Sequence, residues 1–127
     1  SSVVHPFGLK EFTPCTPHDQ NFKFRSPTLV AVAKHCPSIT KLDIAACKDV
    51  SDEALVAVAE SCSGLIALNV THCENLTDAS LGAIAIRCPS LVLLNTTGCT
   101  NLTDASLRAI AEHCPGLANL NISRVHN

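Results

Sequence analysis

The segment NLTDASLGAIAIRCPSLVLLNTTGCT (Asn75–Thr100) is followed at once by a second NLTDASL (Asn101–Leu107), so the same seven residues return after 26 positions. Leucine and cysteine follow this period through most of the 127 residues. The recurring positions include Leu42, Leu68, Leu94 and Leu120, then Leu29, Leu55, Leu81 and Leu107, then Cys36, Cys62, Cys88 and Cys114, then Cys47, Cys73 and Cys99. A fixed period of this length predicts a stack of similar structural units.

Each repeated unit contains two hydrophobic periods. Leu68 and Val70 alternate with polar residues, which predicts a short strand. Leu55, Val58 and Cys62 fall on one face of a helix of about three turns. The residues expected to cap the helix starts are hydroxyl residues, each followed by aspartate: Ser51, Thr77 and Thr103.

A strand and a helix of this size cannot bury their apolar faces alone, so we expect neighbouring units to stack. Parallel strands lie about 4.8 Å apart, whereas packed helices stay about 8–10 Å apart. The difference bends the stack, with strands on the concave side and helices on the convex side. The predicted fold is therefore an α/β solenoid of about three to four repeats, and its end exposes an apolar face. We expect that face to be covered by further repeats or by an assembly partner.

The composition excludes several classes of function. The chain has 46% hydrophobic residues but only 3% aromatic residues, which predicts an aliphatic core. Its formal net charge is −2 and no cluster of Lys and Arg occurs, so we expect neither a nucleic-acid nor a membrane partner. No apolar run approaches the roughly 20 residues that span a bilayer.

The repeat L-x-x-L-x-L-x-x-C, followed by a hydrophobe, Ser/Thr-Asp and L-x-x-(I/V)-A-x-x-C-P-x-L, resembles the cysteine-containing subfamily of leucine-rich repeats, as found in F-box proteins. The resemblance covers residues 24–127, from about Phe24 to Val125. Residues 1–23 form either a divergent N-terminal segment or a degenerate repeat. The resemblance implies a noncatalytic module that holds a substrate for a Skp1–cullin ubiquitin ligase. Residues 1–23 are too short for the F-box through which such proteins bind Skp1.

The eight cysteines allow three interpretations. Packing in the core is favoured over disulfides and over a metal site, because the cysteines occupy repeat positions and no local zinc motif occurs. We therefore expect seven or eight free thiols and a cytoplasmic protein, with the nucleus as the alternative compartment. Five N-x-S/T sequons begin at Asn69, Asn75, Asn95, Asn101 and Asn121. They favour a secreted recognition domain instead, but each also lies in a repeat position with a structural explanation.

We expect no enzymatic activity, no cofactor and no metal, because every candidate group already has a structural role. The function expected is binding of a protein partner on the concave face. The alternative is a structural subunit or fragment docked in a large assembly, such as a ciliary or organellar one. Leu93 is the favoured contact residue. The predicted binding residues are Lys41, Asp43, Asn69, Thr71, His72, Leu93, Asn95, Thr97, Asn119, Asn121 and Arg124.

Overall fold

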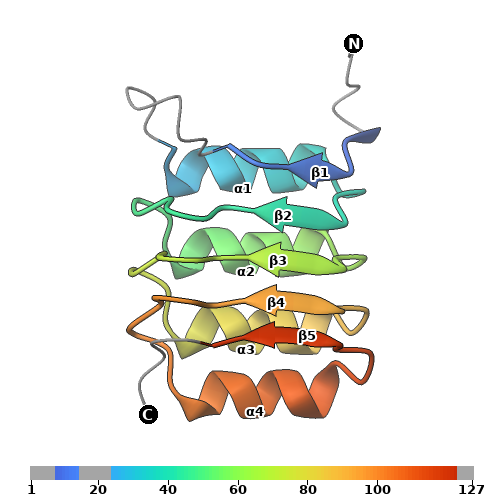
Figure 1. The fold of residues 1–127 in the computed structure, drawn as a ribbon. Helices are drawn as coiled ribbons and strands as arrows, with labels where there is room; N and C mark the ends of the chain where they lie inside the picture. Colours follow the sequence, from blue (N-terminus) through green and yellow to red (C-terminus); the bar gives the residue numbers. More distant parts are fainter. Residues whose placement is uncertain (1–7, 15–23, 123–127) are drawn as a thin grey trace.

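The computed structural model describes residues 8–14 and 24–122, which form a parallel sheet with helices packed along one side (Figure 1). The strands are β1 (Glu11–Phe12), β2 (Lys41–Asp43), β3 (Ala67–Asn69), β4 (Leu93–Asn95) and β5 (Asn119–Asn121). The helices are α1 (Ser26–His35), α2 (Asp52–Ser61), α3 (Asp78–Arg87) and α4 (Asp104–His113). We call one strand and the helix that follows it a rung. Strand and helix alternate along the chain, as the two hydrophobic periods predict.

The strands lie side by side in sequence order, β1-β2-β3-β4-β5. Each described strand pairs in parallel with the next, and Leu42, Leu68, Leu94 and Leu120 lie in one row. β1 continues this arrangement, with Phe12 opposite Leu42. Packing of the helices is also between neighbours, from α1 to α2, α2 to α3 and α3 to α4. The predicted leucine-rich-repeat solenoid is therefore confirmed.

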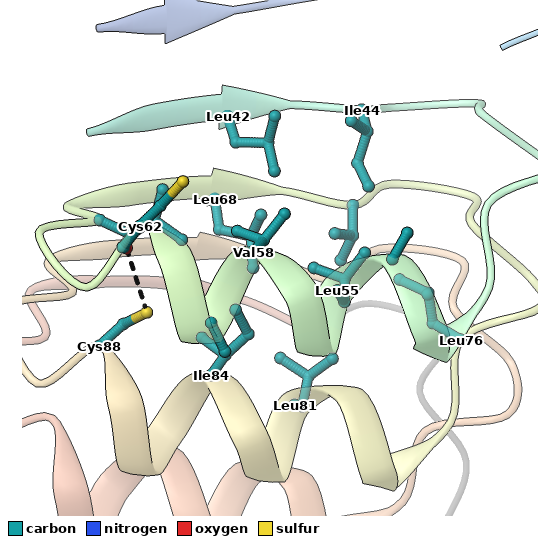
Figure 2. Close-up of a cluster of buried hydrophobic side chains, with 14 of the residues drawn as sticks. Leu42, Ile44, Leu55, Val58, Cys62, Leu68, Leu76, Leu81, Ile84 and Cys88 are labelled. Atoms are coloured by element: carbon teal, nitrogen blue, oxygen red, sulfur yellow. Dashed lines mark hydrogen bonds between the residues drawn. The ribbon is translucent and has the colours of Figure 1, made fainter. Parts of the chain in front are cut away.

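The core lies between the sheet and the helices, and it is aliphatic as the composition predicts. Figure 2 shows Leu68 of β3 above Leu55 and Val58 of α2, with Leu81 and Ile84 of α3 below. All five side chains are at most 1% exposed. These residues belong to one continuous hydrophobic cluster that extends from Phe24 to Cys114, so the rungs bury their hydrophobic surfaces together.

The helices begin and end where the sequence predicts. Thr77 and Thr103 are the N-caps of α3 and α4, and each hydroxyl accepts a hydrogen bond from the backbone two residues later. All four helices end at a buried cysteine whose backbone N–H donates to the carbonyl four residues earlier. Ser51 is the N-cap of α2, as predicted, but its hydroxyl makes no capping hydrogen bond. Its backbone N–H and hydroxyl lie 2.8 Å and 3.2 Å from the Ser26 hydroxyl of α1 instead.

The end of the stack formed by β5 and α4 exposes apolar side chains, as the sequence predicts. Leu120 is 42% exposed and Ile122 is 40% exposed, although Leu94 and Thr96, one repeat earlier, are at most 1% exposed. Leu107 and Ala111 of α4 are also less buried than their counterparts in α3. The cause is the stacking itself, because among the described residues no further rung covers this face.

Candidate functional site

The candidate site is the strand face, defined as the side of the sheet that is turned away from the helices. The strand residues there occupy two rows. The first row is Glu11, Lys41, Ala67, Leu93 and Asn119, and the second row is Asp43, Asn69, Asn95 and Asn121. Every member of both rows is exposed or half-buried, whereas the leucines between them in β2, β3 and β4 are buried. The strand alternation therefore leaves these side chains without a role in the core.

The second row is held in a fixed orientation by local hydrogen bonds. The Oδ1 atom of Asn69 accepts from the backbone N–H of Thr71 at 3.0 Å and from its hydroxyl at 2.6 Å. Asn95 and Thr97 repeat this pair of bonds at 3.0 Å and 2.7 Å. In β2, Asp43 accepts from the backbone of Ala45 at 3.1 Å. The side chains of Asp43, Asn69 and Asn95 thus bond back to the turns that follow their strands.

A hollow of about 260 Å³ crosses the strand face from β1 to β4. It is lined by Glu11, Thr13, Lys41, Leu42, Asp43, Ala67, Asn69 and Leu93. Ala67 lies between Lys41 and Leu93 in the first row, so its methyl group leaves a low point between two longer side chains. Lys41 lies 3.8 Å from Glu11, and both are well exposed, so this ion pair contributes little to stability.

The turns after β2, β3 and β4 each contain one residue with positive φ. These residues are Ala46 (φ 65°), His72 (φ 60°) and Gly98 (φ 75°), which share one place in the repeat. The His72 ring lies over Gly98, where an added Cβ would be 2.1 Å from its Nδ1 atom. His72 is exposed, at the edge of the strand face.

The predicted binding residues that the structure describes lie along this one face and the turns that follow its strands. The first row contains Lys41, Leu93 and Asn119, and the second row contains Asp43, Asn69, Asn95 and Asn121. The turns that follow the strands contain Thr71, Thr97 and His72. Leu93 is 39% exposed, as expected for a contact residue. Arg124 lies outside the described residues.

Sequence reasoning missed several exposed positions beside this face. Ile66 and Val92 are 40% and 36% exposed, and they immediately precede β3 and β4. Glu11 and Thr13 line the hollow although their segment does not follow the repeat closely. The signal for Ile66 and Val92 was available, because both lie one place after the buried leucines Leu65 and Leu91.

The cysteines belong to the core rather than to the site. Cys73 and Cys99 donate their thiol hydrogens to the carbonyls of Ile44 and Val70 in the preceding rungs, at 3.0 Å and 2.9 Å. Cys88 bonds similarly to the carbonyl of Cys62 at 3.5 Å (Figure 2). Burial raises the pKa of Cys73 to about 12, and it raises the pKa of Cys62 and Cys88 to about 11. These thiols are therefore neutral and unreactive at ordinary pH.

The expected number of free thiols is wrong. Six cysteines are free and buried: Cys36, Cys62, Cys73, Cys88, Cys99 and Cys114. Cys47 is buried but disulfide-bonded, and Cys15 lies outside the described residues. Position in the repeat predicts the burial of Cys47 correctly, but it does not predict the disulfide.

Within residues 8–14 and 24–122, no group of three or more His, Cys, Asp and Glu side chains is placed to hold a metal ion. None of the helices in this described part of the chain is long and apolar enough to cross a membrane. The strand face itself presents hydrogen-bonding side chains, the hollow and the exposed part of Leu93.

Comparison with known proteins agrees with this architecture. The family model of the Leucine Rich repeat matches residues 35–59, which span the end of α1, β2 and most of α2. No curated protein matches the chain. A chain from the crystal structure of the Rad7 and Elc1 complex in yeast is similar, with a TM-score of 0.72 and 21% sequence identity. The similarity covers 92% of the present chain but only 29% of the yeast chain.

The fold and the comparisons define the class: the chain is an α/β leucine-rich-repeat solenoid, and this class of fold generally serves protein interaction. The yeast similarity establishes the fold alone, because the two sequences are too different for more.

Proposed function

We propose that this chain is a noncatalytic protein-recognition module that binds its partner through the strand face. The observation that carries the proposal is the contrast between the two sides of one strand. Leu68 of β3 is fully buried, whereas Ala67 and Asn69 beside it are partly exposed and lie in rows continuous with Leu93 and Asn95 of β4. A rigid sheet with a continuous, partly apolar outer surface is suited to binding another protein.

We further propose that the module recognises substrates in a ubiquitin ligase of the Skp1–cullin type. The support for this assignment is the repeat pattern, which resembles that of F-box proteins with leucine-rich repeats. The structurally similar yeast chain comes from a complex of two proteins, Rad7 and Elc1, which supports a protein partner. Because Skp1 binds such proteins through an F-box, contact with Skp1 requires a segment beyond the repeats.

Affinity capture tests both levels of the proposal. The protein is expressed from its native gene with a tag, and the bound proteins are identified with and without Leu93→Asp. Ile86→Asp is the matched control, because Ile86 is 64% exposed on α3, away from the strand face. Partners lost with Leu93→Asp but retained with Ile86→Asp support recognition by the strand face. Co-purification of Skp1 supports the ligase assignment, and its absence argues against that assignment alone.

A structural role in a large assembly is the second candidate, and one observation favours it. Leu120 and Ile122 expose about two-fifths of their surfaces at the last rung, and an assembly partner would bury them. In that case Leu120→Asp would abolish capture of the partners, whereas Leu93→Asp would leave it unchanged.

The proposed location is the cytoplasm or nucleus, and a secreted domain is the third candidate. The Nδ2 atoms of Asn75 and Asn101 donate at 2.6 Å to carbonyls of the preceding rung, which gives two of the sequons a structural role. The disulfide at Cys47 favours an oxidising compartment instead. Mass spectrometry of the native protein decides between these locations, because a secreted domain would carry glycans on Asn69 or Asn95.

A further inference from the structure

We propose that the strand face binds an extended peptide segment of the partner protein that carries no acidic side chain. The backbone carbonyls of this segment accept hydrogen bonds from the side-chain amides of Asn69 and Asn95, and one aliphatic side chain enters the hollow beside Leu93. This inference rests on the proposed recognition function and specifies the chemistry of the partner.

The orientation of the two asparagines is the first step of the argument. The Oδ1 atoms of Asn69 and Asn95 each accept two hydrogen bonds from the threonine two residues later. The Nδ2 groups find no acceptor among the described residues. Because Oδ1 is occupied, each amide presents N–H donors rather than an acceptor to an incoming molecule. The two residues are directly opposite each other in β3 and β4, so these donors are about 4.8 Å apart.

The secondary structure of the partner follows from these donors. Backbone carbonyls within an α-helix are already bonded to N–H groups four residues later. An extended segment has carbonyls free on both sides, so it can accept from Asn69 and Asn95 without losing internal bonds. The strand face therefore favours an extended segment over a helix.

The charge of the segment follows from the surrounding side chains. The hollow is bordered by the carboxylates of Glu11 and Asp43 and by the ammonium group of Lys41, which already faces Glu11 at 3.8 Å. A carboxylate on the ligand would be repelled by Glu11 and Asp43, whose two negative charges exceed the single positive charge of Lys41. The segment that binds here therefore carries no acidic side chain.

The hollow supplies an apolar contact next to the donors. Leu93 is 39% exposed, and Ala67 beside it is too small to fill the space between Leu93 and Lys41. An aliphatic side chain placed over Ala67 would cover Leu93 and remove apolar surface from water. Asn69 lines the same hollow, so one short peptide can use both features.

The test replaces the amide donors with acceptors and keeps the hydrogen bonds between these side chains and the turn. Asn69→Asp and Asn95→Asp replace each outward N–H donor with an oxygen acceptor of the same shape. The fold accepts aspartate at this place, because Asp43 occupies it in β2 and accepts from the backbone of Ala45. Asp43→Asn is the reverse exchange, and Ile86→Ser on α3 is a control for nonspecific effects.

Random-sequence peptides displayed on phage are selected against the whole chain, and the affinities of the enriched peptides are measured by fluorescence anisotropy. We expect an aliphatic residue in the enriched peptides and a loss of affinity of about tenfold to hundredfold for Asn69→Asp and for Asn95→Asp. Leu93→Asp should weaken binding similarly. Asp43→Asn should retain or strengthen it, and Ile86→Ser should leave it unchanged.

The outcomes separate this inference from the proposed function. If Leu93→Asp abolishes binding but both asparagine variants bind normally, recognition by the strand face stands and the amide-donor mechanism is overturned. If enriched peptides are acidic or helical, the mechanism is also overturned. If no peptide is enriched, or if none responds to any strand-face variant, both the inference and the proposed binding surface fail.

Discussion

At the scale of single residues, Gly98 is the most constrained place in the turns. Its φ of 75° disfavours any residue with a Cβ, and the His72 ring lies where that Cβ would be. We expect Gly98→Ala to lower the free energy of unfolding by about 1–2 kcal/mol, as measured by urea denaturation. Gly82→Ala in α3 is the control, because its Cβ would meet nothing within 4 Å and should stabilise the protein by about 0.5–1 kcal/mol.

A second variant separates the two causes. Ala46 adopts a φ of 65° at the equivalent place in the turn after β2, so the backbone conformation is accessible to alanine at a cost in stability. His72→Ala combined with Gly98→Ala removes the ring but keeps the strained φ. If the double variant is as stable as the natural protein, the contact with the ring, rather than the backbone conformation, is the cause.

Asp78 of α3 forms hydrogen bonds with residues at the start of α4. We expect the stability lost on its substitution to depend on pH. Asp78 accepts hydrogen bonds from the backbone and hydroxyl of Thr103, at 2.9 Å and 2.6 Å, and from the hydroxyl of Ser106. Burial alone would raise the pKa of Asp78, but these hydrogen bonds outweigh it and hold the pKa below its usual value. Asp78→Ala should therefore cost about 1.5–3 kcal/mol at neutral pH.

The sign of the pH dependence follows from the lowered pKa of Asp78. The folded protein binds fewer protons at this site than the unfolded chain, so the stabilisation is present above about pH 4 and is lost as the pH falls through the folded pKa. The difference between Asp78→Ala and the natural protein should shrink accordingly in acid denaturation. Asp104→Ala is the control. Asp104 contacts only Arg108 on an exposed surface among the described residues, so its loss should cost under about 1 kcal/mol.

At the scale of helices and strands, the sequence predicts the existence and the ends of the elements well. The helix-ending cysteines and the capping threonines Thr77 and Thr103 behave as their positions predict. The hydrogen bond between Ser26 and Ser51 was not predictable, because it depends on which side chains two neighbouring rungs bring together. The same is true of Asn75, whose amide bonds to Lys48 of the preceding rung rather than within its own turn.

The buried thiols lead to a prediction about alkaline pH. Burial raises the pKa of Cys73 to about 12 and that of Cys62 to about 11, whereas thiols in the unfolded chain ionise near pH 9. The folded protein therefore retains protons that the unfolded chain loses, and stability should fall as the pH rises above about 9. Urea denaturation at increasing pH measures this fall, and Cys62→Ala together with Cys73→Ala should reduce it. A stability that rises with pH in this range would contradict the burial of the thiols.

At the scale of the whole molecule, the stack should unfold as one unit, and the effect of a substitution should depend on its rung. Leu68→Ala removes a fully buried side chain from the middle of the stack and should cost about 2–5 kcal/mol. Leu120→Ala makes the same change in the same row, but Leu120 is 42% exposed, so the cost should be about 1 kcal/mol. Denaturation curves of the two variants give the comparison. Equal losses would mean that Leu120 is covered in solution.

The architecture was predictable from the sequence because a 26-residue period constrains strand, helix and stacking together. The composition of the strand face was also predictable, since alternation places Lys41, Leu93 and Asn95 outward. The hollow over Ala67 was not, because its depth depends on side chains from different strands. The orientation of the asparagine amides was likewise not predictable, since it depends on the fold of the turns, in which the backbone N–H groups of Thr71 and Thr97 donate to Oδ1.

Four side-chain hydrogen bonds at repeated positions share one direction between rungs. Thiols of Cys73 and Cys99 and amides of Asn75 and Asn101 all donate to carbonyls of the rung before them. Each interior rung therefore donates these hydrogen bonds to the rung before it and accepts them from the rung after it. If a second copy of residues 75–100 were inserted after Thr100, its thiol and amide groups would donate to carbonyls of the preceding rung. Its own carbonyls would accept from the following rung. Elongation of the molecule by whole periods should thus preserve its folding, whereas an insertion of half a period should destroy it.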